Sequence, residues 1–186
     1  RRDGCSAFSI NRKWATFASG VLNWNISNES FMKDVEPINN LALRVSYGSN
    51  GNQSIDPYST LAKVGTNKYI FAGDPSYSIT QGISSFALND LGWEKTTGFN
   101  AAVDFSLLKN RLSGTVDAYF TNTTDLFFSL SLPSVSGKTS MLSNLGKIRN
   151  KGVEIGLHSV NIESKDFRWT SDFAFSLNRN KVVTIY

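Results

Sequence analysis

The fold class of this chain is decided by the segment Thr96-Thr97-Gly98-Phe99-Asn100-Ala101-Ala102-Val103-Asp104-Phe105-Ser106-Leu107. Its odd-numbered positions from Phe99 to Leu107 are apolar, whereas Asn100, Asp104 and Ser106 occupy even-numbered ones. Successive side chains of a β-strand point to opposite faces, so the pattern predicts a strand with one apolar and one polar face.

The same alternation returns in several further segments. They cover residues 41–48, 112–121, 152–158 and 168–178, and their charged residues keep to one parity. Only residues 108–111 separate the segment that ends at Leu107 from the next one. A connection this short predicts an antiparallel hairpin, so we expect an all-β, antiparallel sheet.

The lengths of these segments separate two kinds of β-protein. Strands of a soluble sandwich usually run for about five to six residues, whereas a tilted strand that crosses lipid needs ~9–11. The alternating segments here run to about eleven or twelve residues, which favours a transmembrane β-barrel wall of about six spanning strands. The alternative is a soluble carbohydrate-binding β-sandwich module, which would pack its apolar faces against each other.

Tryptophan positions give an expected membrane thickness. We predict a first strand over residues 13–26, in which Trp14 and Trp24 share a parity and lie ten residues apart. At ~3.3 Å per residue and a tilt near 40°, this spacing covers ~25 Å, about the apolar band between two aromatic girdles. With the longer connections of the chain on the outer side, Trp93 is expected in the outer girdle and Trp169 in the inner one.

The connections between the expected strands differ in length. Those over residues 27–40, 109–110 and 163–166 are short, whereas those over 48–95 and 122–147 are long and rich in Gly, Ser, Asn and Pro. Short turns on one side and long loops on the other are typical of bacterial outer-membrane barrels, whose long loops face outward.

Composition excludes several other classes. The net charge of +4 comes from interspersed basic and acidic residues, which does not indicate a nucleic-acid partner. Cys5 is the only cysteine, so the chain offers no internal disulfide and no thiolate metal cluster, and we expect no cofactor and no metal.

Six strands would leave two unpaired edges in lipid, so we expect the chain to be part of a larger barrel.

Several short motifs, taken in order and spacing, resemble the SusC/RagA-like TonB-dependent outer-membrane transporters of Bacteroidetes. The motifs are Arg2-Asp3-Gly4, Leu43-Arg44-Val45-Ser46-Tyr47-Gly48, Asn50-Gly51-Asn52-Gln53, Asn89-Asp90-Leu91-Gly92-Trp93-Glu94-Lys95-Thr96-Thr97, Asn110-Arg111-Leu112-Ser113-Gly114, Thr124-Asp125-Leu126, Asn144-Leu145-Gly146 and Asn150-Lys151-Gly152-Val153-Glu154.

The resemblance implies a fragment from the C-terminal half of a barrel of twenty-two strands in the bacterial outer membrane. Residues 1–186 would then be a partial barrel domain that lacks the plug and the TonB box. It further implies nutrient import, of glycan oligosaccharides or peptides, under a SusD-like surface lipoprotein lid. The energy would come from the proton-motive force through TonB-ExbB-ExbD acting on the absent plug.

Candidate substrate contacts lie mostly in the first long loop. Amide groups both donate and accept hydrogen bonds and tyrosine rings offer stacking surfaces, and Tyr119 has the parity of the polar, lumen-facing side. The candidates are Asn50, Asn52, Gln53, Tyr58, Tyr69 and Tyr119, and Tyr77 offers a further stacking surface. The alternatives are that Asn-Gly serves as a turn and that the tyrosines pack against the lipoprotein.

Catalysis is the rival class of function. The single histidine, His158, has lumen parity, and Asp172 on the neighbouring predicted strand could orient it. Neither a nucleophile elbow nor a metal-ligand cluster accompanies the pair, so we expect no enzymatic activity.

Overall fold

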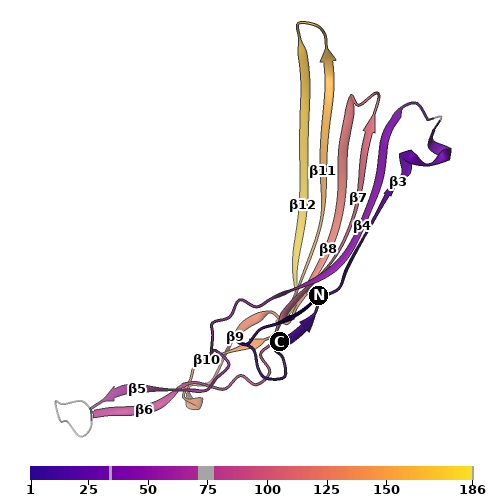
Figure 1. Ribbon diagram of the computed structural model, residues 1–186. Coiled ribbons are helices and arrows are strands. Elements are labelled where there is room, and N and C mark those ends of the chain that lie inside the picture. The colour runs from indigo at the N-terminus through magenta and orange to yellow at the C-terminus, as the bar shows by residue number, and fades with distance from the viewer. Residues whose placement is uncertain (34, 71–77, 186) are drawn as a thin grey trace.

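The computed structural model describes residues 1–33, 35–70 and 78–185. Its main feature is a single curved antiparallel sheet with the strand order β12-β11-β8-β7-β4-β3 (Figure 1). The six strands are β3 (Ser19–Asn25), β4 (Ile38–Asn52), β7 (Glu94–Leu107), β8 (Leu112–Thr124), β11 (Lys147–Glu163) and β12 (Arg168–Thr184). Five of them have 13 to 17 residues, long enough to cross the apolar core of a bilayer at a tilt.

Smaller elements lie in the connections. Three two-stranded sheets pair β1 (Arg2–Gly4) with β2 (Trp14–Thr16), β5 (Lys63–Tyr69) with β6 (Ser78–Ser85), and β9 (Phe127–Ser131) with β10 (Ser140–Asn144). The 3-10 helices are η1 (Ile26–Asn28), η2 (Ser30–Met32) and η3 (Ser134–Ser136). Among the described residues, no helix is both long and apolar enough to pass through a membrane.

In the central rows of the sheet, the register places apolar residues beside apolar residues. One row, for example, runs through Leu43, Val103, Val116, Ile155 and Phe175. Because side chains alternate along each strand, all rows of this parity share one side of the sheet, which we name the apolar face. The other side, named the polar face, carries the charged residues of the strand centres.

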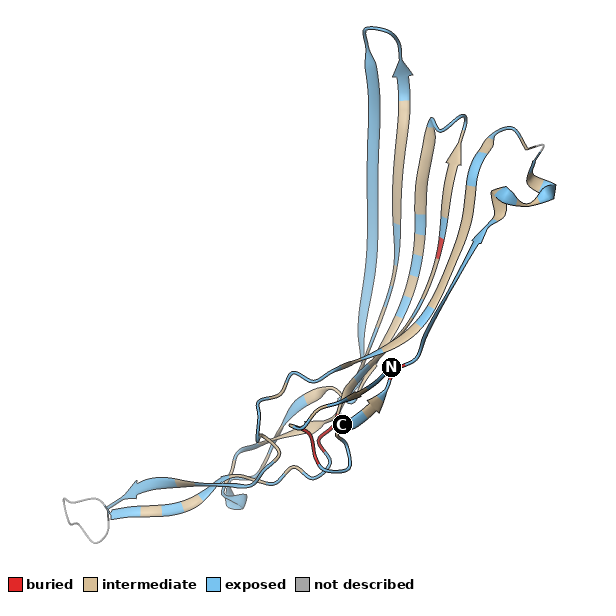
Figure 2. Cartoon of the chain, in the orientation of Figure 1, coloured by how far each residue is buried: buried red, intermediate tan, exposed pale blue. Residues whose placement is uncertain are grey.

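The apolar face is not covered by a second layer of the described chain. Among the described residues, the buried apolar side chains are Phe8, Phe17, Leu91 and Ala102, whereas Trp24, Phe120 and Phe175 are 40–45% exposed. Figure 2 shows that the long strands are mostly intermediate or exposed. A β-sandwich would bury this face against a second sheet. The single layer therefore contradicts the sandwich alternative and fits a wall whose apolar face meets lipid.

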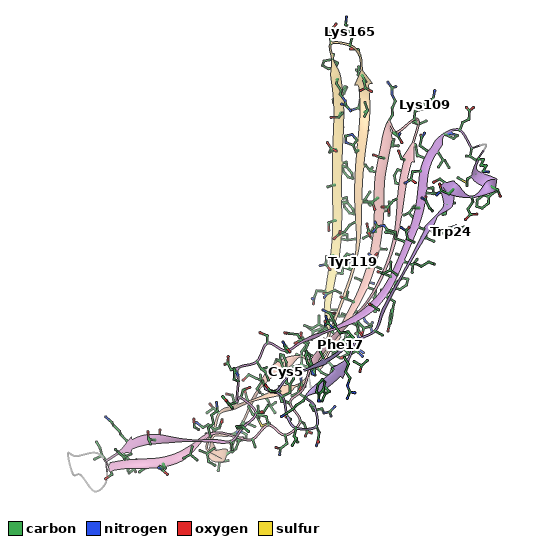
Figure 3. The ribbon with its side chains drawn as sticks, in the orientation of Figure 1. Cys5, Phe17, Trp24, Lys109, Tyr119 and Lys165 are labelled. Carbon is green, nitrogen blue, oxygen red and sulfur yellow. The ribbon has the colours of Figure 1, made fainter. Side chains whose placement is uncertain are left out.

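The predicted asymmetry of the connections is confirmed. Residues 26–37, 108–111 and 164–167 connect strands at one end of the sheet, named the short-turn end, where Figure 3 labels Lys109 and Lys165. Residues 53–70, 78–93 and 125–146 lie at the opposite end, named the long-loop end, from which the β5–β6 hairpin projects far beyond the sheet (Figure 1).

The predicted first strand over residues 13–26 is wrong. The segment is divided into β2, which pairs with β1, and β3, which pairs with β4. Between them Phe17 is buried, and its backbone N–H donates to the Arg1 carbonyl oxygen at 2.8 Å. Since this contact redirects the chain, Trp14 and Trp24 do not lie on one strand and do not measure the thickness of the apolar band.

The expected girdle position of Trp93 is also wrong. Its ring packs against Phe8 and Phe17, with centroid distances of 5.1 and 5.6 Å, and its indole N–H donates to the Lys13 carbonyl oxygen at 3.2 Å. Trp93 thus belongs to a loop cluster. Trp169, by contrast, is 52% exposed at the short-turn end of β12, and its place in the inner girdle stays a prediction.

Candidate functional site

The long loops start from a small aromatic core at the base of the long-loop end. Phe8 is 1% exposed and stacks with Phe127 at a centroid distance of 6.2 Å, in addition to its contact with Trp93. Phe17 also contacts the Trp93 ring, in an edge-to-face arrangement with an interplanar angle of 71°. We name Phe8, Phe17, Trp93 and Phe127 the aromatic cluster. Its members come from three distant parts of the chain, so it joins the N-terminal segment to both long loops.

Hydrogen bonds fasten the N-terminal segment to the first long loop. The Ser9 backbone N–H donates to the Leu91 carbonyl oxygen at 3.1 Å, and the Ser9 hydroxyl donates to the Leu88 carbonyl oxygen. Thr60 donates from Oγ1 to the Ala7 carbonyl oxygen at 3.1 Å and accepts from the Leu88 backbone N–H at 3.0 Å through its own carbonyl oxygen. These bonds hold three segments around a common hollow.

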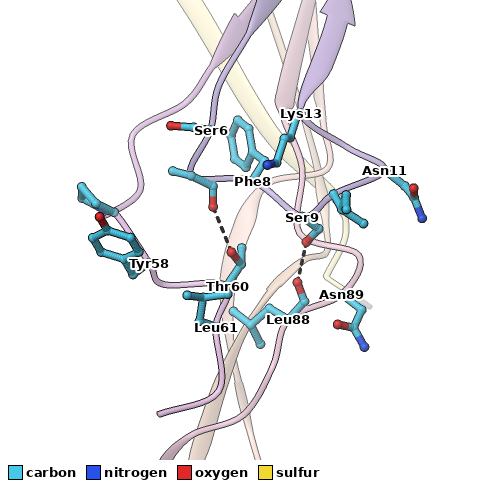
Figure 4. A pocket seen from close by; sticks show the side chains of 13 residues that line it. Ser6, Phe8, Ser9, Asn11, Lys13, Tyr58, Thr60, Leu61, Leu88 and Asn89 are labelled. Carbon is cyan, nitrogen blue, oxygen red and sulfur yellow. Dashed lines mark hydrogen bonds between the residues drawn. The ribbon is translucent and has the colours of Figure 1, made fainter.

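This hollow is a pocket of about 770 Å³. Residues 6–11 and Lys13 line one side, Leu88 and Asn89 another, and the third is lined by Pro57, Tyr58, Thr60 and Leu61 (Figure 4). Apolar walls from Phe8 and Leu61 alternate with hydroxyl, amide and ammonium groups. A pocket with mixed walls and a few placed polar groups is the usual form of a site for small ligands.

Tyr58 is the predicted candidate that lines this pocket. It is 70% exposed and its backbone has φ 62°, a left-handed conformation that non-glycine residues rarely adopt. Its carbonyl oxygen accepts from the Leu61 backbone N–H at 3.2 Å. Such backbone strain concentrates at ligand-contacting positions, because the surrounding structure must hold it in place.

The amide candidates lie next to one another where β4 leaves the sheet. Asn50, Asn52 and Gln53 are all exposed, and Asn52 Oδ1 accepts from the Ser54 backbone N–H at 3.0 Å, as in an Asx turn. Gly51 lies among them against the aromatic cluster, because a Cβ there would overlap Phe17 and lie 2.7 Å from Trp93. The packing of Gly51 against the aromatic cluster therefore holds the backbone of these amides in place, but the Asn52 side-chain oxygen is already used in the turn.

The remaining tyrosine candidates are far apart. Tyr69 ends β5 on the projecting hairpin, whereas Tyr119 lies on the polar face of β8 in the main sheet (Figures 1 and 3). Tyr119 packs over Gly152 of β11, where a Cβ would lie 2.5 Å from the Tyr119 Cζ and Oη atoms. Tyr77 lies outside the described residues. The six predicted residues therefore do not form one site: they lie in an amide group, a pocket, a hairpin and a wall position.

The polar face carries an ion network that crosses three strands. Arg44 binds Asp104 through two contacts, Nε to Oδ2 at 2.5 Å and Nη2 to Oδ1 at 3.0 Å, and its Nη2 lies 3.8 Å from Asp117 Oδ2. Asp117 also accepts from Asn100 at 3.3 Å and from Thr115 at 3.1 Å. The shared guanidinium compensates two carboxylates, so this part of the wall is a connected polar surface.

A second polar pair lies toward the short-turn end. His158 Nδ1 and Asp172 Oδ1 are 2.6 Å apart on β11 and β12. Ser113 is the Cα partner of His158 on β8, yet no hydrogen bond joins their side chains in the described ranges. Within these same ranges, no group of three potential metal-ligating side chains occurs. The pair thus has an orienting carboxylate but lacks a bonded nucleophile.

Sequence reasoning missed most of the pocket. Ser9, Thr60 and Leu88 were not predicted, because they come from segments about 30 to 80 residues apart that carry no strand periodicity. The segment Asn89-Asp90-Leu91-Gly92-Trp93 was recognised only as a motif. Leu91, Gly92 and Trp93 are apolar or small and directly precede a strand, and this pattern could have predicted a buried loop.

A single layer of long, two-faced antiparallel strands with short turns at one end and long loops at the other defines the wall of a membrane β-barrel. The chain belongs to the family described as TonB dependent receptor-like, beta-barrel, whose sequence profile matches residues 2–184. This membership confirms the predicted resemblance and the predicted fold class.

Individual relatives agree with this membership. The chain is 42% identical over 185 residues to TonB-dependent receptor P3 of Formosa agariphila, with 100% of this chain and 18% of that protein covered. It is 37% identical over 191 residues to TonB-dependent receptor SusC of Bacteroides thetaiotaomicron, with 100% and 19% covered. The chain thus spans less than a fifth of the length of these relatives.

Solved structures give the same picture. The chain matches the structure of the RagAB peptide transporter with a TM-score of 0.85 and 30% identity, over 100% of this chain and 20% of that one. The match to the RagAB peptide importer in the 'open-open' state has a TM-score of 0.84 and 30% identity, over 97% and 19%.

Proposed function

We propose that this chain is a section of the barrel wall of an outer-membrane importer that takes up nutrient oligomers. The observation that carries the proposal is the two-faced sheet: its apolar face is uncovered, whereas its polar face is bonded by the Arg44 network. Such a sheet is stable where lipid lies on one side and a hydrated lumen or plug on the other.

The imported cargo is, in this proposal, a glycan oligosaccharide or a peptide. Support comes from the similarity to a protein named SusC and to the RagAB peptide transporter. Both cargo classes present rings or planar amides, to which tyrosine and asparagine side chains are suited. We assign the contact to the pocket of Tyr58 first, and to Asn50, Asn52, Gln53, Tyr69 and Tyr119 as further contacts.

The remaining parts of the import machinery are proposals as well. A SusD-like lipoprotein would close over the long-loop end, and TonB-ExbB-ExbD would act on a plug that lies outside these 186 residues. The long loops support this orientation, because loops of this length face the cell exterior in outer-membrane barrels. No enzymatic step is proposed.

One experiment tests the membrane placement and the partner together. The polypeptide that contains this segment is extracted from outer membranes with detergent, and its mass and any co-purifying lipoprotein are determined. We expect a chain several times longer than 186 residues with a lipoprotein attached. A stable 20.5 kDa species that is soluble without detergent would overturn the proposal.

A second experiment distinguishes the cargo classes. Cells with and without the full-length transporter are given a labelled mixture of oligosaccharides or a labelled mixture of tryptic peptides, and uptake is followed. We expect transporter-dependent uptake of one mixture, reduced by Tyr58→Ala. Unchanged uptake and unchanged lipoprotein association in both Tyr58→Ala and Tyr69→Ala would contradict the assignment of the loop.

A further inference from the structure

Four basic residues interrupt the apolar face near the long-loop end of β11 and β12. Lys151 is the Cα partner of Arg179, and Arg149 is the partner of Lys181, so the four side chains form a two-by-two block on adjacent strands. Their odd numbering gives them the parity of Val153 and Leu177 on the apolar face, and all four are exposed. We name Arg149, Lys151, Arg179 and Lys181 the basic block.

No carboxylate neutralises the basic block within the described part of the chain. None of its members takes part in an ion pair there. The recorded contact of Arg149 is with an aromatic ring, since its guanidinium carbon lies 5.3 Å from the centroid of Phe120. Four adjacent cations repel one another, so the arrangement needs anions from outside this segment.

The position of the block along β12 places it at the border of the apolar band. Ten residues separate Trp169 from Arg179, and the intervening positions of the same parity are Ser171, Phe173, Phe175 and Leu177. At ~3.3 Å per residue and a tilt near 40°, this distance equals ~25 Å of height, about the thickness of the apolar band. The block therefore lies at the height of lipid headgroups, on the side of the long loops.

A groove accompanies the block. It has a volume of about 460 Å³, and five of its lining residues have the parity of the apolar face: Phe120, Lys151, Val153, Leu177 and Arg179. Tyr119 and Gly152, which have the other parity, complete the lining. Two cationic heads thus lie beside an aromatic ring and two aliphatic side chains. This combination suits an amphipathic ligand with an anionic head and a hydrocarbon chain.

We propose that the basic block and this groove bind the phosphorylated headgroup of an outer-leaflet lipid. Phosphate oxygens accept hydrogen bonds from the two arginines and the two lysines, and the acyl chain follows Val153 and Leu177 along the apolar face. The inference rests on the proposed function, because that function sets which end of the sheet faces the outer leaflet.

The simpler explanation for basic residues near a membrane border is that each extends its head into water. That explanation requires neither adjacent cations nor a groove between them. It predicts equal affinity for phosphorylated and unphosphorylated lipids, and this difference makes the two explanations separable.

The test uses the full-length transporter in a neutral detergent. Binding of diphosphoryl lipid A and of the same lipid after enzymatic dephosphorylation is titrated by native mass spectrometry. The binding variant is Lys151→Gln with Arg179→Gln, and the matched control is Lys109→Gln with Lys165→Gln, which removes two cations from the short-turn end (Figure 3).

We expect tight binding of the phosphorylated lipid only. Since a basic residue near an anionic lipid surface strengthens binding by roughly fivefold, the binding variant, which lacks two, should lose about 25-fold in affinity. The control variant should bind like the wild type. Equal affinity for both lipids, or an equal loss in the control variant, would overturn the proposal.

Inorganic phosphate distinguishes the two sources of the anion. If millimolar phosphate alone displaces the lipid completely, the site is one for free phosphate, and the assignment to a lipid is overturned. A separate uptake assay on the same variants distinguishes failure of the lipid proposal from failure of the proposed function. Loss of transport with intact lipid binding would bear on import and not on the lipid site. Heat-modified migration of both variants on gels verifies that the barrels have folded.

Discussion

Asn144 of β10 binds Gly92 through both ends of its side-chain amide. Its Oδ1 accepts from the Gly92 backbone N–H at 2.6 Å, and its Nδ2 donates to the Gly92 carbonyl oxygen at 3.0 Å and to the Asp125 carbonyl oxygen at 2.7 Å. One side chain thus satisfies three backbone groups from two loops. This bridge connects the second long loop to the segment that contributes Trp93 to the aromatic cluster.

Replacing Asn144 by Ala should loosen both loops without affecting the strands. A partly buried N–H and carbonyl without partners cost about 1–3 kcal/mol in local opening free energy. Hydrogen exchange of residues 88–93 and 141–146 in the full-length transporter measures this change. Asn178→Ala is the control, since no side-chain hydrogen bond of Asn178 occurs in the described ranges. Unchanged exchange in Asn144→Ala would mean that the aromatic cluster alone holds the loops.

Gly152→Ala should destabilise the wall, whereas Gly156→Ala on the same strand should not. A Cβ at Gly152 would lie 2.5 Å from Tyr119 and 2.7 Å from the Leu177 carbonyl oxygen, while at Gly156 the nearest atom lies at 3.6 Å. We expect a loss of about 1–3 kcal/mol for Gly152→Ala and less than about 0.5 kcal/mol for Gly156→Ala, measured by denaturant unfolding.

The cause of the Gly152 effect is tested by a second substitution. Tyr119→Ala in the Gly152→Ala background removes the contact with the ring but leaves the contact with the Leu177 carbonyl oxygen. Stability should therefore recover only in part. Equal effects of the two glycine substitutions would show that the close approach of Tyr119 is not what restricts this position.

The strands and their faces were predictable from the sequence because each strand meets two different environments. Phe99 and Asp104 had to lie on opposite faces, and the structure confirms this. The position of Phe17 was not predictable: its parity is opposite to that of Trp14 and Trp24, and it lies between β2 and β3 in contact with Trp93, 76 positions away. The pocket of Tyr58 was missed for the same reason, since only tertiary contacts bring Ser9, Thr60 and Leu88 together.

Removing the cation from the polar network should destabilise the wall more than removing one anion. In Arg44→Met, Asp104 and Asp117 lose their shared guanidinium, whereas in Asp104→Asn the contact of Arg44 with Asp117 remains. We expect a lower thermal midpoint for Arg44→Met than for Asp104→Asn. The difference should shrink at 1 M salt, where charges are screened within ~3 Å.

Arg168→Met is the matched control for Arg44→Met. Arg168 lies 3.6 Å from Glu163, and both side chains are more than half exposed. An exposed pair of this kind contributes little to stability. A midpoint change as large as that of Arg44→Met would mean that removal of any arginine, and not the shared network, explains the effect.

Tyr58 allows the role of its ring to be separated from the role of its backbone. Asn tolerates the left-handed conformation with φ 62°, so Tyr58→Asn should remove the ring while the loop keeps its shape. If the ring stacks on cargo, the half-saturating concentration of the transported mixture should rise roughly two- to tenfold. Tyr58→Phe keeps the ring and should transport like the wild type. Equal uptake by the Asn and Phe variants would exclude stacking of the ring on cargo. A ring that only binds cargo leaves the loop unchanged when no cargo is present. Faster hydrogen exchange of residues 57–61 in Tyr58→Asn would therefore show that the ring stabilises the loop.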